Sequence, residues 1–439
     1  MNTVSLMPSC SHKVVFLFAV LLGSVLLAGC SSIARGVTEA VLEQGTDKKD
    51  LRQCEIDGPA FDGLSASLDK QTPQSPETTK VLMVHGISNH VPGYSNRFQK
   101  KLYEELGLSV MDSTVKTIQL DSKDFTKENG LTLGTLRVTR HVDPKKTHEL
   151  IFYELTWSPI TSQQKEGLES DSTNNDGLAR ASLNDSLKNF INTTVPDLLI
   201  YNGNGYRDIT LSVFQSVCWM LSNTWDDLPG NGRHRCEDWP DSVFSNLAAN
   251  DHFFVTHSLG SRITIDTIQN FSTDKNPESE SPLARKVRDI IRDKDFTVFM
   301  MANQLPLLQM GRDRPNATGA RRDYCSPQGK FFDRRVMRKM TIVAISDPND
   351  ILSYPIPTDF TEKQIDSRIC PSVTNVSLNI AEQKDLFDTA SFANPLTAHS
   401  GYMDDDRVIK LIARGLRRDN LSPLIAKRCR WSETTALKD

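Results

Sequence analysis

The sequence predicts an α/β fold, in which a mostly parallel central sheet is flanked by helices and a helical insertion precedes the strand that ends at Ser258. Short apolar runs of the length of buried strands recur at 81–84, 253–255, 296–301 and 341–345, and stretches with helical spacing lie between them. Strands that are apolar throughout are typical of parallel sheets covered on both faces. Polar residues directly after these runs are therefore expected at the carboxyl edge of the sheet.

The amino terminus carries a targeting pattern. Lys13 precedes an apolar run over 14–27, which is shorter than the roughly 20 residues of a transmembrane helix. The run closes with Leu-Ala-Gly before Cys30 and resembles a bacterial lipoprotein signal, which implies removal of residues 1–29 and lipidation of Cys30. The resemblance implies a lipid-anchored protein of the cell envelope, with Ser31 favouring an outer-membrane position that faces the periplasm or the exterior. A plain secretory signal or a short anchor is the alternative.

Residues 30–78 are expected to form a tether and amino-terminal extension, since the sheet begins clearly only near Val81. The folded domain is then expected over 79–430. Its first helix is predicted at 95–106 from apolar residues that share one helical face. The next predicted strands lie at 136–142 and 149–157.

An insertion of about 160–236 precedes the strand that ends at Ser258. Its first part, 161–176, is expected to be a polar loop, and 182–236 is helical in pattern and rich in aromatic residues. Amphipathic periodicity does not say which surface a helix covers. Two interpretations therefore stay open, a cap over the functional site or ordinary flanking helices.

The second half of the domain continues the alternation. The run at 304–308 could line an apolar pocket or belong to the core. Polar loops are expected at 273–282 and 316–330, a last strand at 372–380 and a closing helix at 406–416.

The segment around Ser258 predicts a strand, a tight turn with one serine, and a helix. Phe253 to Val255 form the apolar run, and Thr256-His257-Ser258-Leu259-Gly260 follows. This unit resembles the nucleophile elbow of α/β-hydrolases, G-x-S-x-G, with Thr256 in place of the first glycine. The resemblance implies that Ser258 is a nucleophile, that the N–H of Leu259 helps to bind an oxyanion, and that Gly260 permits close packing. An ordinary serine at a helix cap is the alternative.

A His-Gly pair ends the first apolar run. The sequence His85-Gly86-Ile87 resembles the oxyanion loop of the same family, which implies a second donor in the N–H of Ile87. Gly86 would let the backbone turn close to a substrate, and His85 would support the loop. His257 is assigned a packing or positioning role, and His90 is expected at the surface.

The acid that such a site needs is expected after the strand at 341–345. Asp347 and Asp350 both lie in this turn, and Asp350 is favoured because a short apolar stretch and Pro355 follow it. The alternative is that both aspartates only shape the turn.

His399 is the only one of the nine histidines that follows Asp350 in the chain. It lies in a loop-like His-Ser-Gly-Tyr segment. The order Ser258, Asp350, His399 is that of the α/β-hydrolases. The resemblance covers roughly 81–417 and implies a serine esterase or lipase-like enzyme that cleaves carboxylic esters through an acyl-serine. An acyltransferase or amidase with the same triad, or a non-catalytic binding lipoprotein that kept the fold, are the alternatives.

The charge composition limits the classes of partner that are expected for this chain. Loss of residues 1–29 would remove only Lys13 from the 51 basic residues and would leave 55 acidic ones, so a nucleic-acid partner is not expected. An acyl substrate and a membrane contact through Cys30 are the expected partners, whereas protein partners and oligomeric state stay unknown. No cofactor is expected, and no metal site either, since the chain has no H-E-x-x-H motif.

The cysteines fit an oxidising compartment. Cys10 would leave with the signal and Cys30 would be modified, which leaves six. Two or three disulfides are therefore plausible among the 15 possible pairings of these six cysteines, and Cys218–Cys236 is the preferred local pair. Buried free thiols are the alternative.

Overall fold

The computed structural model describes residues 53–72, 77–110, 115–121, 132–173, 180–222, 224–236, 242–271, 282–386 and 390–433. The predicted signal, Cys30, most of the expected tether and nearly all of the loop expected at 273–282 lie outside the described residues. The chain divides into two compact units, one formed by Arg52–Ser162 with Ile200–Asp439 and one that contains Gln163–Leu199.

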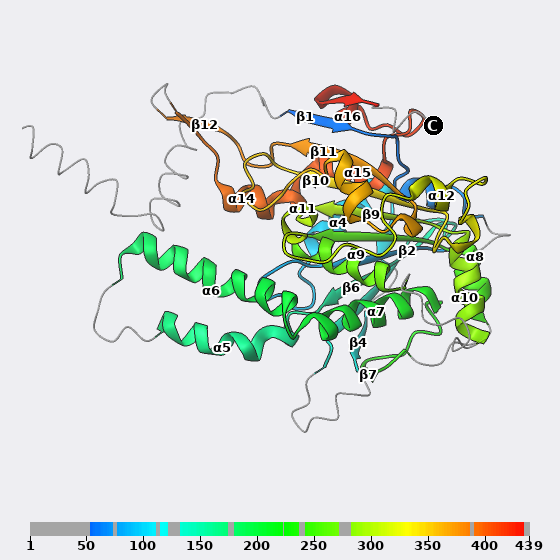
Figure 1. The fold of residues 1–439 in the computed structure, drawn as a ribbon, viewed down its shortest axis with the longest axis horizontal. Coiled ribbons are helices and arrows are strands. Elements are labelled where there is room, and N and C mark those ends of the chain that lie inside the picture. Colours follow the sequence, from blue (N-terminus) through cyan, green and yellow to red (C-terminus); the bar gives the residue numbers. More distant parts are fainter. Residues whose placement is uncertain are drawn as a thin grey trace, which may run out of the picture. The chain divides into compact units, whose positions relative to one another are not determined.

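The larger unit is built on a mixed, mostly parallel sheet, which confirms the predicted fold class (Figure 1). The described residues form 12 strands in this sheet, with β3 (Ser109–Val110) paired to β5 beside the main path. The order across the sheet is β14 (Cys429–Ser432), β1 (Cys54–Asp57), β11 (Pro371–Leu378), β10 (Lys339–Ser346), β9 (Asp295–Met301), β8 (Asp251–His257), β2 (Thr79–Val84), β6 (Glu149–Thr156), β5 (Thr135–Val142), β4 (Lys116–Leu120) and β7 (Gly232–His234).

Six neighbouring strands, from β6 through β2, β8, β9 and β10 to β11, run parallel. The outer strands β5 and β1 each pair antiparallel with this block. Because β2, β8, β9 and β10 are covered on both faces, their residues are buried almost without interruption. The turns that follow these four strands share the carboxyl edge of the sheet.

The helices of the larger unit cover both faces. They are α3 (Leu64–Leu68), α4 (Asn96–Leu106), α7 (Tyr206–Ser222), α8 (Ser242–Ala249), α9 (Leu259–Phe271), α10 (Pro282–Arg292), α11 (Leu305–Leu308), α12 (Arg321–Cys325), α13 (Thr358–Gln364), α14 (Pro395–Ser400), α15 (Asp406–Arg414) and α16 (Pro423–Arg428). Short 3-10 turns lie at Phe332–Arg334, Ser367–Ile369 and Gly401–Asp404, and β12 (Lys384–Leu386) pairs with β13 (Ala390–Phe392) as a separate hairpin.

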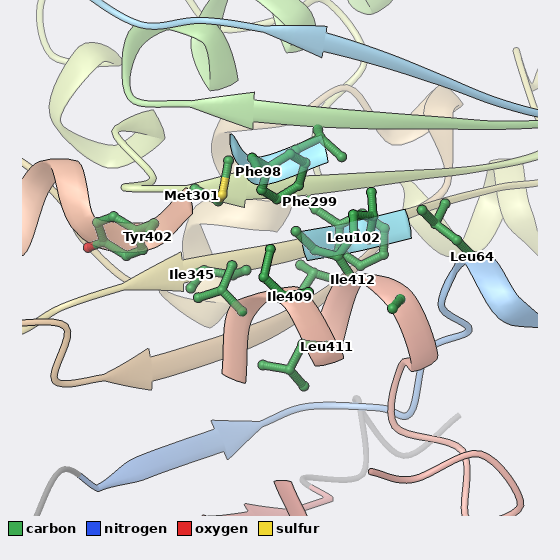
Figure 2. Close-up of a cluster of buried hydrophobic side chains, with 14 of the residues drawn as sticks. Leu64, Phe98, Leu102, Phe299, Met301, Ile345, Tyr402, Ile409, Leu411 and Ile412 are labelled. Carbon is green, nitrogen blue, oxygen red and sulfur yellow. The ribbon is translucent and has the colours of Figure 1, made fainter. Parts of the chain in front are cut away.

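One core lies between the sheet and the helices α3, α4 and α15. Leu102 of α4 and Ile412 of α15 pack there against Phe299 and Ile345 of the strands (Figure 2). Tyr402 ends this cluster, and Figure 2 shows its hydroxyl directed away from the apolar side chains. Burial of these side chains fixes the strand ends relative to one another.

The insertion contributes to the sheet and to its other face. Helix α7 packs against β2, β6 and β4, and Lys80 Nζ of β2 donates to the carbonyl of Met220 in α7 at 2.8 Å. This helix is therefore an ordinary flanking helix rather than a cap. Strand β7, at the end of the insertion, pairs with β4.

The smaller unit contains most of α5 (Pro159–Thr173) and of α6 (Ser182–Asn202). Lys165 Nζ lies 3.0 Å from Asp197 Oδ1 within it, and both side chains are buried. The expectation of a polar loop at 161–176 is wrong, because α5 is a helix over most of that stretch. A helix with many exposed polar residues lacks the apolar stripe from which a helix is predicted.

Both ends of the described chain join the sheet, contrary to the expected tether and the expected last strand. Strand β1 lies within the expected tether, and β14 follows the strand expected to be the last. Only Cys54 and Ile56 are buried among the four residues of β1, too few for a periodic signal. Cys54 and Cys429 face each other across the β1–β14 pair and form a disulfide.

Two further disulfides join Cys218 to Cys236 and Cys325 to Cys370. The first confirms the preferred local pair. The other expected strands and helices are confirmed within one or two residues at most ends, as α4, β5, β6, β9, β11 and α15, whereas the loop expected at 316–330 contains the short helix α12.

Buried histidines predict acid sensitivity. Burial, assisted by the charge of Arg137, lowers the pKa of His141 to about 3. Between pH 6.5 and 3, His141 is therefore protonated in the unfolded chain and neutral in the folded chain. The free energy of unfolding consequently falls as the pH falls. Urea unfolding should show that this one group removes about 2 kcal/mol between pH 7 and 5.

The matched variant is His141→Phe, which keeps a ring in the stack on Tyr103 at 3.3 Å. Between pH 7 and 5, the unfolding free energy of this variant should fall by about 2 kcal/mol less than that of the wild-type protein. An identical pH slope in both proteins would refute the assignment.

Candidate active site

Ser258 lies in the turn between β8 and α9 and is held in a left-handed conformation, with φ of 54°. This region is unfavourable for a residue with a side chain and costs about 1 kcal/mol or more. The turn is fixed from both sides, since the N–H of Ser258 donates to the carbonyl of Met301 at 2.9 Å and its carbonyl accepts from Ser261 Oγ at 2.7 Å. The residue expected to carry the chemistry is therefore one of the positions at which the backbone is strained.

Gly86 and Gly260 are required by the close approach of β2 to this turn. A Cβ on Gly86 would lie 2.5 Å from Ser258 Cβ and 3.1 Å from its Oγ. A Cβ on Gly260 would lie 2.4 Å from the carbonyl oxygen of Val84. The first position of the pentapeptide, Thr256, is fully buried in β8 and is accommodated with its side chain.

The structure brings Ser258, His399 and Asp350 into one hydrogen-bonded chain. Ser258 Oγ lies 3.1 Å from His399 Nε2, and His399 Nδ1 lies 2.9 and 3.0 Å from the two oxygens of Asp350. A carboxylate can only accept, so Nδ1 carries the proton and Nε2 is free to accept from the serine hydroxyl. The side chain of Asp350 is fully buried, whereas that of His399 is 14% exposed.

Asp350 is ionised in this arrangement. Burial by itself raises the pKa of its carboxyl, but the hydrogen bond and charge of His399 and the N–H of Leu352 outweigh burial and hold the pKa below its ordinary value. A buried negative charge beside Nδ1 favours a positive imidazole during a reaction.

Asp347 has a different role. Its Oδ2 accepts from the N–H groups of Ile380 and Ala381 at 2.6 and 3.0 Å, and its Oδ1 accepts from the N–H of Asn349 at 2.7 Å. It therefore ties the end of β10 to the end of β11. The preference for Asp350 as the partner of the histidine agrees with this geometry.

Two side chains orient the acid and the histidine. The hydroxyl of Tyr402 donates to Asp350 Oδ2 at 3.2 Å and accepts from the N–H of Asp347 at 2.7 Å. His257 Nε2 lies 2.9 Å from the carbonyl oxygen of His399, and burial lowers its pKa to about 3. His257 is therefore a neutral donor that holds the histidine backbone, consistent with the positioning role expected for it.

The N–H groups of Ile87 and Leu259 are candidate oxyanion donors. Leu259 is the first residue of α9, where an N–H has no partner within its own helix. Within the described ranges neither N–H donates to a protein acceptor. Leu259 directly follows Ser258 in the chain. Ile87 directly follows Gly86, which packs on Ser258.

His85 supports the loop after β2. Its Nε2 accepts from the N–H of Trp157 at 3.1 Å, and its Nδ1 donates to the carbonyl of Gly86 at 2.7 Å. The ring stacks on Trp157 at 4.7 Å and contacts the ring of His90 at 4.2 Å. His90 is half-buried in this stack, so the surface position expected for it holds only in part.

His399 lies on α14 rather than in a loop. Asn394 caps this helix by accepting from the N–H groups of Leu396 and Thr397, and Pro395 occupies the first turn. An asparagine followed by proline is a helix-start signal that the sequence analysis did not use. Tyr402 and Trp157 were also missed, and no local pattern marks either, since each acts through a partner distant in the chain.

The run at 304–308 forms α11, with Leu305 and Leu308 buried in the core. Among the described residues, no cluster of three or more histidine, cysteine or acidic side chains could hold a metal ion. Of the helices that the structure describes, none has the length and apolarity needed to cross a bilayer.

The packing at Gly260 gives a stability prediction. Gly260→Ala should destabilise the protein by about 2 kcal/mol or more, because the added methyl group meets backbone of β2 that cannot move freely. Gly167→Ala is the matched control. It lies in α5 with nothing within 4 Å of the added carbon and should be neutral or stabilising by up to about 1 kcal/mol.

Urea unfolding of both variants measures the difference. Equal stability of the two would show that the approach of β2 to α9 does not constrain position 260.

Comparisons with known proteins add no assignment to this geometry. No protein-family model, no curated protein and no solved structure matches the chain.

Proposed function

We propose that this chain is a membrane-anchored serine hydrolase of the α/β-hydrolase type that cleaves carboxylic esters through an acyl-serine intermediate. The observation that carries the proposal is the hydrogen-bonded chain from Ser258 through His399 to the buried Asp350. A serine hydroxyl is a poor nucleophile near neutral pH unless a neighbouring base accepts its proton. This arrangement supplies the base and the charge that orients it.

The fold supports the same family. The candidate nucleophile follows β8, the acid follows β10, and the histidine lies beyond β11, with the His-Gly loop after the adjacent β2. The strained serine turn and the two tightly packed glycines are features that an elbow of this type requires. A solvent-exposed helix cap would require none of them.

The first half of the reaction forms a bond between Ser258 Oγ and the ester carbonyl carbon. The hydroxyl proton passes to His399 Nε2, and the electron pair of the carbonyl moves to its oxygen. The N–H groups of Ile87 and Leu259 would bind that oxyanion, an effect worth about 3 kcal/mol for each donor. Collapse then breaks the bond to the alcohol, which leaves with the proton held by His399.

The second half repeats these steps with water as the nucleophile. His399 takes a proton from water as the water oxygen bonds to the acyl carbon. Collapse breaks the acyl–serine bond, His399 returns the proton to Ser258 Oγ, and the acid is released. Asp350 remains ionised throughout and stabilises the imidazolium in both halves. No cofactor is required by this scheme.

One observation favours the alternative of a non-catalytic binding lipoprotein. Ser258 is fully buried, although a nucleophile must meet its substrate. An acyltransferase or amidase would use the same three residues, and rates on matched esters and amides separate these reactions.

Active-site labelling tests the proposal directly. A fluorophosphonate probe should label the wild-type protein and should not label Ser258→Ala, because the probe reacts only with an activated serine. The variant Thr267→Val is a control on the same helix and should still label, because the Thr267 hydroxyl donates only to the carbonyl of Ile263, away from the serine turn. A folded wild-type protein that takes up no probe would favour the binding alternative.

The two aspartates predict different losses. Asp350→Asn should reduce kcat by about 10⁴, because an amide removes the charge and can favour the wrong tautomer of His399. Asp347→Asn should act mainly through stability, by about 1 kcal/mol, since Asp347 bonds backbone N–H groups. Kinetics on folded protein distinguish the residues, and small effects of both would remove Asp350 from the triad.

The proposed anchor gives a separate prediction for the cell envelope. Cys30→Ser should abolish incorporation of labelled palmitate, because the thiol is the acceptor of the lipid. The variant should then no longer be processed as a lipoprotein. Palmitate labelling with membrane fractionation measures this. Unchanged labelling of the variant would remove the anchor from the proposal.

A further inference from the structure

We propose that the carboxyl edge of the sheet, where Ser258 lies, docks on a lipid bilayer through a rim of exposed apolar side chains. This apolar rim consists of Val91, Met310, Ile351, Tyr354 and Leu396. The inference rests on the proposed lipidation of Cys30, and it deepens the proposed function by naming a membrane-embedded acyl ester as the substrate class.

The rim side chains are unusually exposed for their kind. Val91 is 72% exposed, Met310 70%, Ile351 64% and Leu396 57%. Apolar side chains gathered on one surface mark contacts with proteins, ligands or membranes, whereas scattered ones need no explanation. The position of these side chains in the fold therefore decides whether they indicate a contact surface.

Each rim residue comes from a segment that borders the candidate site. Val91 lies in the loop after β2 that also carries Ile87, and Ile351 directly follows Asp350. Leu396 lies on α14, one turn before His399. The loop after β9 is joined to the acid turn, since the N–H of Tyr354 donates to the carbonyl of Asn303 at 2.8 Å. Met310 follows α11 in that same loop.

The chain enters the domain at this same edge. Strand β1 runs antiparallel to β11, so Cys54 at its start lies opposite Leu378 at the end of β11. The carbonyl of Gln53 accepts from the N–H of Asn379 at 3.3 Å, two residues from the N–H of Ala381 that Asp347 binds. Four strand spacings separate β1 from β8, so the entry point lies about 19 Å from the Ser258 strand.

The proposed lipid on Cys30 selects a bilayer as the occupant. From Cys30 to Gln53 the chain can span at most about 80 Å, which is ample to lay this edge on the membrane that holds the lipid. The disulfide of Cys54 with Cys429 fixes the entry point to the carboxyl-terminal strand. An anchor attached there keeps the rim near the bilayer surface, whereas the opposite edge would require the tether to pass around the domain.

Charge argues for apolar insertion rather than electrostatic attraction. The full chain has a formal net charge of −4, so anionic lipid should not draw it to the surface. Docking should therefore occur equally on phosphatidylcholine vesicles with and without phosphatidylglycerol.

Photo-crosslinking of the lipidated full chain in such vesicles tests the surface without using catalysis. Met310→p-benzoylphenylalanine and Leu396→p-benzoylphenylalanine should crosslink to labelled phospholipid at least about tenfold more than Val115→p-benzoylphenylalanine. Val115 is also exposed but precedes β4, four strands from β8, where the next residue, Lys116, is level with Leu82 in the middle of β2. The same contrast should hold in a Ser258→Ala background.

A kinetic test examines the substrate class. The combined variant Val91→Asn, Met310→Asn, Leu396→Asn should hydrolyse a soluble short-chain ester within about twofold of wild type. Its rate on an ester embedded in vesicles should fall about tenfold or more, since the rim no longer inserts. Val115→Asn should change neither rate.

The outcomes separate the two proposals. Equal lipid crosslinking from the rim and from position 115, crosslinking of the rim to protein alone, or failure of the full chain to remain with the vesicles would each overturn the docking surface. Rim-specific crosslinking together with no turnover of any ester would leave the surface standing and would remove the hydrolase.

Discussion

The contact between the end of β2 and the turn after β8 is the constraint on which the rest of the site depends. Two parallel strands and one helix meet there with no room for a single added carbon at Gly86 or Gly260. This packing holds Ser258 in a conformation that an isolated chain would avoid. It also sets the N–H groups of Ile87 and Leu259 near the serine. A rigid pair of buried strands therefore supplies the precision that catalysis would need.

The charge at the site is controlled by a second layer of contacts. Asp350 is buried and ionised, which would be unfavourable without the donors around it. His399, Tyr402 and the N–H of Leu352 supply those donors. His257 stays neutral because it is buried, so it can hold the histidine backbone without competing for the serine proton. One nitrogen of one imidazole, His399 Nε2, is thus placed to accept a proton from Ser258.

The edge of the sheet joins the site to the two ends of the domain. Arg407 donates to the carbonyls of Gln53 and Asn379, and its guanidinium pairs with Asp405 at 2.6 Å just after Tyr402. The segment that enters the domain and the helix that follows the histidine are therefore fixed by the same side chain. If the entry point is held at a membrane, the candidate site is held there too.

The sequence by itself determined the parallel core, the order of the motifs, and a candidate triad of Ser258, His399 and one of two aspartates in a single turn, because apolar runs ending in polar turns report burial locally. Tertiary structure alone decided that Asp350 rather than Asp347 meets His399, since both occupy one turn and differ only in what lies opposite. It also decided that β1 and β14 close the sheet and that Tyr402 orients the acid. These features depend on pairing between residues far apart in the chain, and short polar segments carry no periodic pattern that would reveal their partners.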